Sequence, residues 1–196
     1  MTGRRGTPND PERRERILDA ALEVIAEQGV HRTTHRRIAA RAQVPLGSLT
    51  YYFDGLPEIL RSAFVRFVDR LSGRYWEAVR GAEGTEAACA GIVEMICGDR
   101  YTSPQEQTIL VELYSYGSFD AQVGAMRRQW QDRSQEALAA HFDRDTARAL
   151  DALLEGWTLH RGFGDFRADR GAVERAVHRL AGQEPAQRPS GSGAGR

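Results

Sequence analysis

The chain has 196 residues, of which 41% are hydrophobic, and its 27 basic residues, all arginine, balance 27 acidic ones. This length fits one large domain or a small domain fused to a larger one, with enough apolar side chains for a core. A net charge of zero excludes attraction to nucleic acid by overall charge, so such attraction must come from local clusters. The sequence shows no run of about 20 apolar residues and no apolar signal-peptide core, which predicts a cytoplasmic protein that does not cross a membrane.

The first predicted helix begins after a polar segment. Residues 1–9 are expected to form a flexible arm. Asp10 followed by Pro11 is typical of an N-cap and the first helical position. Apolar side chains then recur at helical spacing as far as Gly29, which is suited to end the helix.

Two short helices are predicted next. Thr34 can cap the first of them, and a tight turn at Gln43 leads to another helix at about 45–52. Short helices joined by a four-residue turn form a helix-turn-helix. We therefore expect a three-helix domain over residues 10–55.

The remaining pattern is also helical. A long helix is predicted from Pro57 to about Arg80. Further helical patterns lie at about 85–98, 104–116, 120–141, 144–163 and 170–181. Since no strand-like alternation interrupts them, the predicted fold class is all-α, with a second helical domain over 56–182 and a disordered tail over 183–196.

One segment departs from the balanced charge of the chain. Residues 28–53 contain Arg32, Arg36, Arg37 and Arg41 and no acid, whereas acids and arginines are mixed on both sides. A helix-turn-helix recognises DNA by placing its second helix in the major groove while neighbouring groups hold phosphates. Acidic side chains there would repel the duplex. The segment is therefore predicted to lie on DNA.

The third predicted helix carries side chains suited to a DNA groove. Gly47 and Ser48 allow a close approach, and Thr50 offers a methyl and a hydroxyl to a base edge. Tyr51 and Tyr52 can reach phosphates through their hydroxyls. These five residues are our candidates for contact from this helix.

The start of the second predicted helix suits a phosphate. Free backbone N–H groups and the positive end of the helix dipole lie at Thr34. Arg36 and Arg37 stand beside it. All three are candidate phosphate contacts.

The segment RERILDAALEVIAEQGVHRTTHRRIAARAQVPLGSLTYYFDGLPEILRSAF, residues 14–64, resembles the DNA-binding domain of the TetR family of bacterial transcriptional regulators. The shared features are an ILDAAL-type helix, Thr-Thr before IAxxA, a valine at the turn, a G-S-L core and Y-x-F before the next helix. The resemblance implies a ligand-responsive regulator, most simply a repressor, with an effector-binding and dimerisation domain after the helix-turn-helix. It implies contacts with DNA at Thr34, Arg36, Leu46, Gly47, Ser48, Thr50 and Tyr52.

Three residues depart from the usual family pattern. Gln43 stands where the turn usually has glycine, and a left-handed backbone there costs a non-glycine residue about 1 kcal/mol. Leu46 replaces a polar residue of the recognition helix, so its reading of a base would be apolar. Leu56 replaces a frequent lysine. The resemblance therefore implies that DNA affinity depends more on Arg36, Arg37 and the N-terminal arm.

Aromatic side chains are frequent between residues 56 and 120. They could line a pocket or simply form the core. Because members of the TetR family hold small molecules in this domain, the resemblance implies an effector site, although the sequence does not identify the effector. The candidate lining residues are Glu112, Tyr114, Tyr116 and Trp130.

Two adjacent predicted helices carry wide apolar faces. A helical hairpin of this kind can pair with its copy or pack inside its own domain, and the pattern favours neither. The resemblance favours a homodimer, which predicts a palindromic operator on double-stranded DNA. The candidate interface residues are Val123, Met126, Leu138, Leu150, Leu154 and Trp157.

Two other classes of function were weighed. The sequence contains no HExxH, GxSxG or P-loop motif, and His31 and His35 straddle the turn between two helices, so we expect no enzyme, no metal site and no cofactor. The alternative is a helical protein-interaction module without sequence-specific DNA binding. Loss of binding with rising salt would favour DNA as the partner.

Overall fold

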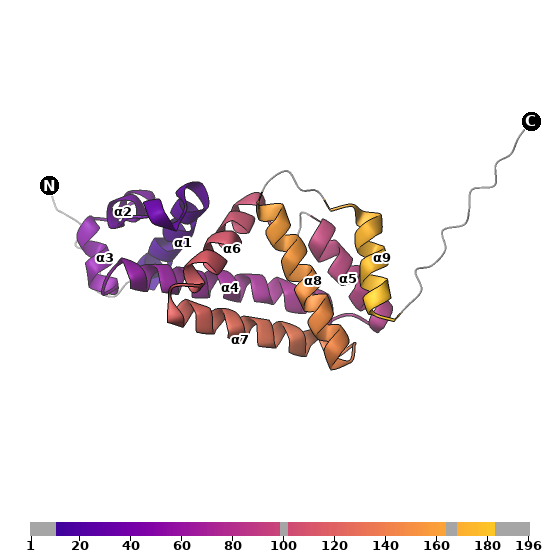
Figure 1. Cartoon of the computed structure of the whole chain (residues 1–196). Coiled ribbons are helices and arrows are strands. Elements are labelled where there is room, and N and C mark those ends of the chain that lie inside the picture. The colour runs from indigo at the N-terminus through magenta and orange to yellow at the C-terminus, as the bar shows by residue number, and fades with distance from the viewer. Residues whose placement is uncertain (1–10, 99–101, 164–167, 183–196) are drawn as a thin grey trace, which may run out of the picture.

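The computed structural model describes residues 11–98, 102–163 and 168–182, and within these ranges the secondary structure is entirely helical (Figure 1). The helices are α1 (Pro11–Gln28), η1 (Val30–Arg32), α2 (His35–Ala42), α3 (Leu46–Tyr52), α4 (Leu56–Arg80), α5 (Thr85–Cys97), α6 (Pro104–Gly117), α7 (Ala121–Leu138), α8 (Arg144–Gly162) and α9 (Arg170–Leu180). The all-α prediction is confirmed. The predicted arm at 1–9 and tail at 183–196 lie outside the described residues.

The N-terminal head consists of α1, α2 and α3, at the indigo end of the molecule (Figure 1). Apolar positions at helical spacing place Ile17, Ile38 and Leu49, one from each helix, in a shared core where none of them is exposed. This core continues without a break into the first half of α4. Because α4 runs from the head into the other helices, it joins the two ends of the molecule (Figure 1).

Charged side chains add to the contact between α4 and the head. Arg66 of α4 forms a two-pronged ion pair with Asp19 of α1, at 2.8 and 2.9 Å, and also contacts Glu15. Arg70 adds a contact of 3.2 Å to the same Asp19. Since a bidentate arginine pair fixes both position and orientation, α1 should follow movements of α4.

The body consists of α5 to α9 packed around the C-terminal half of α4. The helices α6, α7 and α8 pack on one another, and α5 packs against α9 at the far end (Figure 1). Ser103 caps α6 in a capping box with Glu106, while Asp120 and Asp143 cap α7 and α8. In the described part of the chain, no helix is long and apolar enough to cross a membrane.

The body core includes side chains that the sequence assigned to a dimer interface. Val123, Leu138 and Leu150 are each at most 2% exposed in the single chain. They face the core of their own chain, so they have no surface to offer a second one and that assignment is corrected. Met126 and Trp157 remain half-buried.

Candidate nucleic-acid interface and internal cavity

The turn between α2 and α3 depends on an unusual backbone conformation at Gln43. Its φ of 54° and ψ of 44° lie in the left-handed region, where glycine is favoured. The N–H of Val44 then donates to the carbonyl of Ala39 at 3.0 Å, which closes the end of α2. This geometry starts α3 in the direction that exposes its outer face.

The exposed face of α3 consists of the candidates for contact with bases. Leu46 and Tyr51 are 51% and 63% exposed, although both are large apolar or aromatic side chains. Gly47 and Thr50 are also exposed. Leu49, between them in sequence, is fully buried and anchors the helix. The helix therefore presents mostly small and apolar groups to solvent.

Two further candidates on α3 are only half-buried. Ser48 lies in the first turn of the helix. Tyr52 packs against the core of the head, and its ring meets the ring of Tyr51 edge-on at 4.9 Å. This contact limits the orientations that the two phenol groups can adopt.

The arginines of the basic segment have different environments. Arg41 binds Glu23 at 3.0 Å and Glu27 at 2.5 Å on α1. The guanidinium of Arg37 donates to the carbonyl of Arg32 at 2.5 Å, which leaves its charge uncompensated. Among the described residues, no acid pairs with Arg36 or Arg37. These two side chains are exposed beside the N-terminus of α2.

Thr34 caps α2 as the sequence indicates. Its hydroxyl accepts a hydrogen bond from the backbone N–H of Arg37 at 3.3 Å. Thr34 remains exposed, as does Arg36 two residues further on. The cap therefore fixes the start of α2 without burying it.

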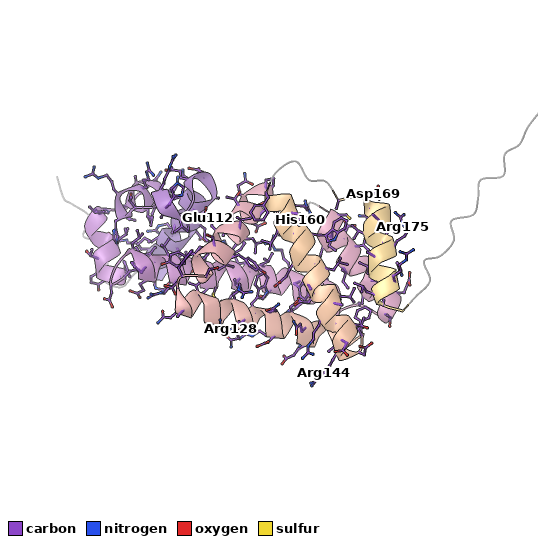
Figure 2. All side chains as sticks on the ribbon, viewed as in Figure 1. Glu112, Arg128, Arg144, His160, Asp169 and Arg175 are labelled. Atoms are coloured by element: carbon purple, nitrogen blue, oxygen red, sulfur yellow. The ribbon has the colours of Figure 1, made fainter. Side chains whose placement is uncertain are left out.

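Glu112 joins the body to the head. Its carboxylate on α6 accepts a hydrogen bond from the backbone N–H of Val30, the first residue of η1, at 2.9 Å. Figure 2 shows Glu112 where α6 meets the head. Glu112 does not line the internal cavity described below, because this turn of α6 faces the head, which the sequence could not show.

Tyr116 does not line that cavity either. Its ring packs against Phe64 of α4 with the ring centres 5.8 Å apart, beside the core that the head shares with α4. Tyr114 and Trp130 do lie at an internal cavity. Tyr114 and Tyr116 are two residues apart and therefore lie on opposite sides of α6, which divides the predicted set.

The internal cavity lies between α4, α5, α6, α7 and α8 and has a volume of about 70 Å³. Apolar and aromatic side chains form most of its wall. Its lining residues are Leu71, Arg74, Tyr75, Met95, Thr102, Leu110, Tyr114, Trp130, Gln131, Ser134, Asp151, Leu154, Glu155, Thr158 and Leu159. Leu154, predicted for a dimer interface, therefore faces the interior.

Two acids of α8 reach this cavity. Burial raises the pKa of Asp151, although the hydroxyl of Ser134 donates to it at 2.5 Å and the amide of Gln135 at 3.1 Å. Burial also raises the pKa of Glu155; a hydrogen bond with Tyr114 opposes this shift and the charge of Asp151 adds to it. Sequence reasoning missed both acids. The available signal was their spacing of one helical turn on an otherwise apolar face.

Comparison with known proteins agrees with this geometry. Residues 17–63 match the model of the family described as bacterial regulatory proteins, tetR family. SCO7518 of Streptomyces coelicolor A3(2), assigned as a transcriptional regulator, is 40% identical, with a TM-score of 0.77 and coverage of 87% of this chain and 99% of that one.

A second solved structure decides the family. SCO1917 from Streptomyces coelicolor A3, a member of the TetR family, is 30% identical, with a TM-score of 0.70 over 87% of this chain and 99% of its own. The chain belongs to the TetR family. It is a helix-turn-helix transcriptional regulator rather than an enzyme, since its relatives are regulators.

A third structure of this TetR-like kind contains a ligand. The multidrug binding protein EbrR, complexed with ethidium, is 29% identical to this TetR family member, with a TM-score of 0.74. The alignment covers 86% of this chain and 98% of EbrR. The similarity therefore extends well beyond the helix-turn-helix into the helical body.

Proposed function

We propose that the protein is a repressor that binds a palindromic operator as a homodimer and is released by a small-molecule effector. The observation that carries the proposal is the exposed face of α3, with Leu46 and Tyr51 in solvent beside the uncompensated charges of Arg36 and Arg37. Exposed apolar and small groups suit base edges, and arginines suit phosphates. An operator on bacterial DNA lies in the cytoplasm, so we place the protein there.

Each candidate has a role in this proposal. Leu46 and the methyl of Thr50 contact thymine methyl groups, and Gly47 and Ser48 allow α3 to approach the groove. Tyr51 and Tyr52 donate their hydroxyls to phosphates. Thr34, Arg36 and Arg37 hold a phosphate at the N-terminus of α2. In this division of labour, residues 10–55 form the DNA-binding domain and 56–182 the effector and dimerisation domain.

The effector acts through α4. This helix contributes Leu71 and Tyr75 to the cavity wall and Arg66 to the ion pair with α1. An effector that binds more tightly to the open-cavity state than to the closed one would favour the open state. The resulting shift of α4 would move the head at its other end and change the separation of the two heads in the dimer. The ethidium complex of EbrR supports the binding of a small molecule by a protein of this fold.

The dimer forms through the outer side of α8. Gly156 has open space around it there, since a Cβ at that position would meet no atom within 4 Å, and the neighbouring Trp157 is half-buried and packs against the body core. A flat face with a small residue allows two helices to approach closely. Pairing of equivalent faces gives a two-fold axis, and hence two recognition helices for two half-sites.

Selection of duplexes from a random DNA pool tests the proposal. We expect the purified chain to enrich a palindrome at near-physiological salt. Arg36→Ala should lower the affinity for that palindrome about tenfold and reduce the slope of its salt dependence by about one, because one phosphate contact is lost. Tyr52→Phe should weaken binding without changing the fold, as measured by circular dichroism.

Arg175→Ala is the matched control, because this arginine is exposed on α9, in the body. It should leave operator affinity unchanged. Enrichment of no palindrome by a folded dimer would contradict the proposal and favour the protein-interaction module. Equal affinities of Arg36→Ala, Tyr52→Phe and the unchanged chain would refute the assigned contacts.

A further inference from the structure

Asp151 and Glu155 are unusual residues for the wall of an apolar cavity. They lie four residues apart on α8, so that both carboxyls lie on the same side of the helix. Asp151 is only 1% exposed, and Glu155 is half-buried. Two acids in such a position repel each other and lose hydration, which destabilises a folded chain unless a partner compensates.

The described protein supplies little compensation. The side chains that donate to Asp151 at short distance, Ser134 and Gln135, are both neutral. Arg74 also lines the cavity, but its guanidinium is bound to Glu106 at 2.5 and 3.3 Å. The cavity therefore has an excess of acidic groups over cations that are available to them.

Arg127, a further arginine near these acids, is only partly available. The guanidinium of Arg127 lies over the ring of Tyr114, 5.3 Å from its centre. It lowers the pKa of Glu155, but it is the weakest of the four influences on that group. Arg127 therefore reduces the negative charge at the cavity without cancelling it.

The walls around the two acids suit a flat aromatic group. Tyr114 and Trp130 supply aromatic rings, and Leu110 supplies an apolar surface. Aromatic faces attract cations, an effect that increases when water is excluded. Carboxylates and ring faces together therefore select positive charge on an apolar skeleton.

Trp130 also determines how much space is available. It lines both the internal cavity of about 70 Å³ and an outer groove of about 670 Å³ between α4 and α7. Pockets for organic ligands usually have about 300 to 1,000 Å³, so the internal cavity alone is too small. Rotation of this half-buried ring would join the two spaces.

We propose that the effector is a lipophilic aromatic cation, which enters past Trp130 and places its positive charge at Asp151 and Glu155. This inference rests on the proposed function, because it names the chemical class of the effector. The acids remain without a strong partner in the free protein and are neutralised by the ligand. Their burial thus provides selectivity for charge rather than stability.

The test compares malachite green, a triarylmethane cation, with leucomalachite green, its neutral reduced form on the same skeleton. Binding of each to the full-length chain is measured by calorimetry without DNA. We expect the cation to bind at least about tenfold more tightly, and Asp151→Asn and Glu155→Gln each to remove about tenfold or more of that preference. Glu136→Gln, an exposed acid on α7, should have no effect.

Glu155→Gln keeps the test decisive if Asp151→Asn fails to fold, because Glu155 is less buried. Equal binding of the two dyes, or a preference that survives in the folded variants, would overturn the inference. Operator release by a neutral or anionic compound would also overturn it while leaving the proposed function intact. A chain that binds no operator at all would instead contradict the proposed function.

Discussion

The guanidinium of Arg41 is bound to Glu23 and Glu27, and these two carboxylates raise its pKa. Arg41 thus fastens α2 to α1 from within the basic segment. Its charge is already balanced before any duplex arrives, unlike that of Arg36. The number of arginines in a segment therefore overstates the charge that the segment offers to phosphates, and the salt dependence of binding should reflect the smaller number.

Gln43 is a residue whose conformation conflicts with its identity. Its φ of 54° is strained for a side chain with a Cβ. Gln43→Gly should therefore raise the free energy of unfolding by up to about 1 kcal/mol, reduced by the greater freedom of glycine in the unfolded chain. Urea denaturation followed by circular dichroism measures this change. A variant less stable than the unchanged chain would show that the Gln43 side chain stabilises the turn.

At the scale of the elements, the sequence predicted the helices because their apolar spacing is a local property. The predicted end of the seventh helix near 141 was too late, since α7 ends at Leu138. The direction in which each helix faces depends on its neighbours. For this reason the sequence predicts a pocket position for Glu112 and Tyr116 and a dimer surface for Leu150, whereas these side chains pack inside the molecule. It also gives no sign that Asp151 and Glu155 line the cavity.

The candidate DNA contacts were easier to place. Thr34, Arg36, Leu46 and Thr50 lie in a short motif whose three helices fix one another, so the sequence alone indicates which side chains point outward. The cavity, by contrast, is built by five helices, α4 to α8, whose lining residues span the chain from Leu71 to Leu159. No local spacing reports how such helices are rotated against each other.

The helix α6 provides a second connection between body and head, and it can be tested through one hydrogen bond. Glu112→Ala removes the acceptor of the Val30 N–H, which should lower the free energy of unfolding by about 1 to 3 kcal/mol. Hydrogen exchange at the Val30 amide should become faster. Glu112→Gln, which keeps an acceptor oxygen, should restore most of the protection.

Unchanged exchange at Val30 in Glu112→Ala would show that α6 does not hold the head through this contact. The helix α4, with its ion pair from Arg66 to Asp19, would then be the main connection. The two outcomes therefore distinguish coupling through two helices from coupling through one.

For the whole molecule, the proposed dimer predicts a contrast between two glycines. Gly156 of α8 and Gly73 of α4 both lie inside helices, and a Cβ at either would meet no atom within 4 Å. Gly156→Arg should give a folded monomer with weak operator binding, because the new side chain would stand between the two copies. Gly73→Arg should remain a dimer. Analytical ultracentrifugation measures both.

Both substitutions remove a glycine from a helix interior, so each should stabilise the single chain by about 0.5 to 1 kcal/mol. Because both variants are expected to fold at least as stably as the unchanged chain, a monomeric Gly156→Arg would indicate loss of the interface rather than misfolding. A dimeric Gly156→Arg would exclude the outer side of α8 as the interface.

The narrowness of the internal cavity has a consequence for the concentration at which the protein responds. A site of about 70 Å³ must be opened before an organic molecule fits, so the observed dissociation constant contains the free energy of opening as well as that of contact. Any change that loosens the packing around the cavity, such as a smaller side chain at Met95 or Leu110, lowers the free energy of opening. The threshold of the response can therefore evolve through core packing alone, while the acids that select the ligand stay the same.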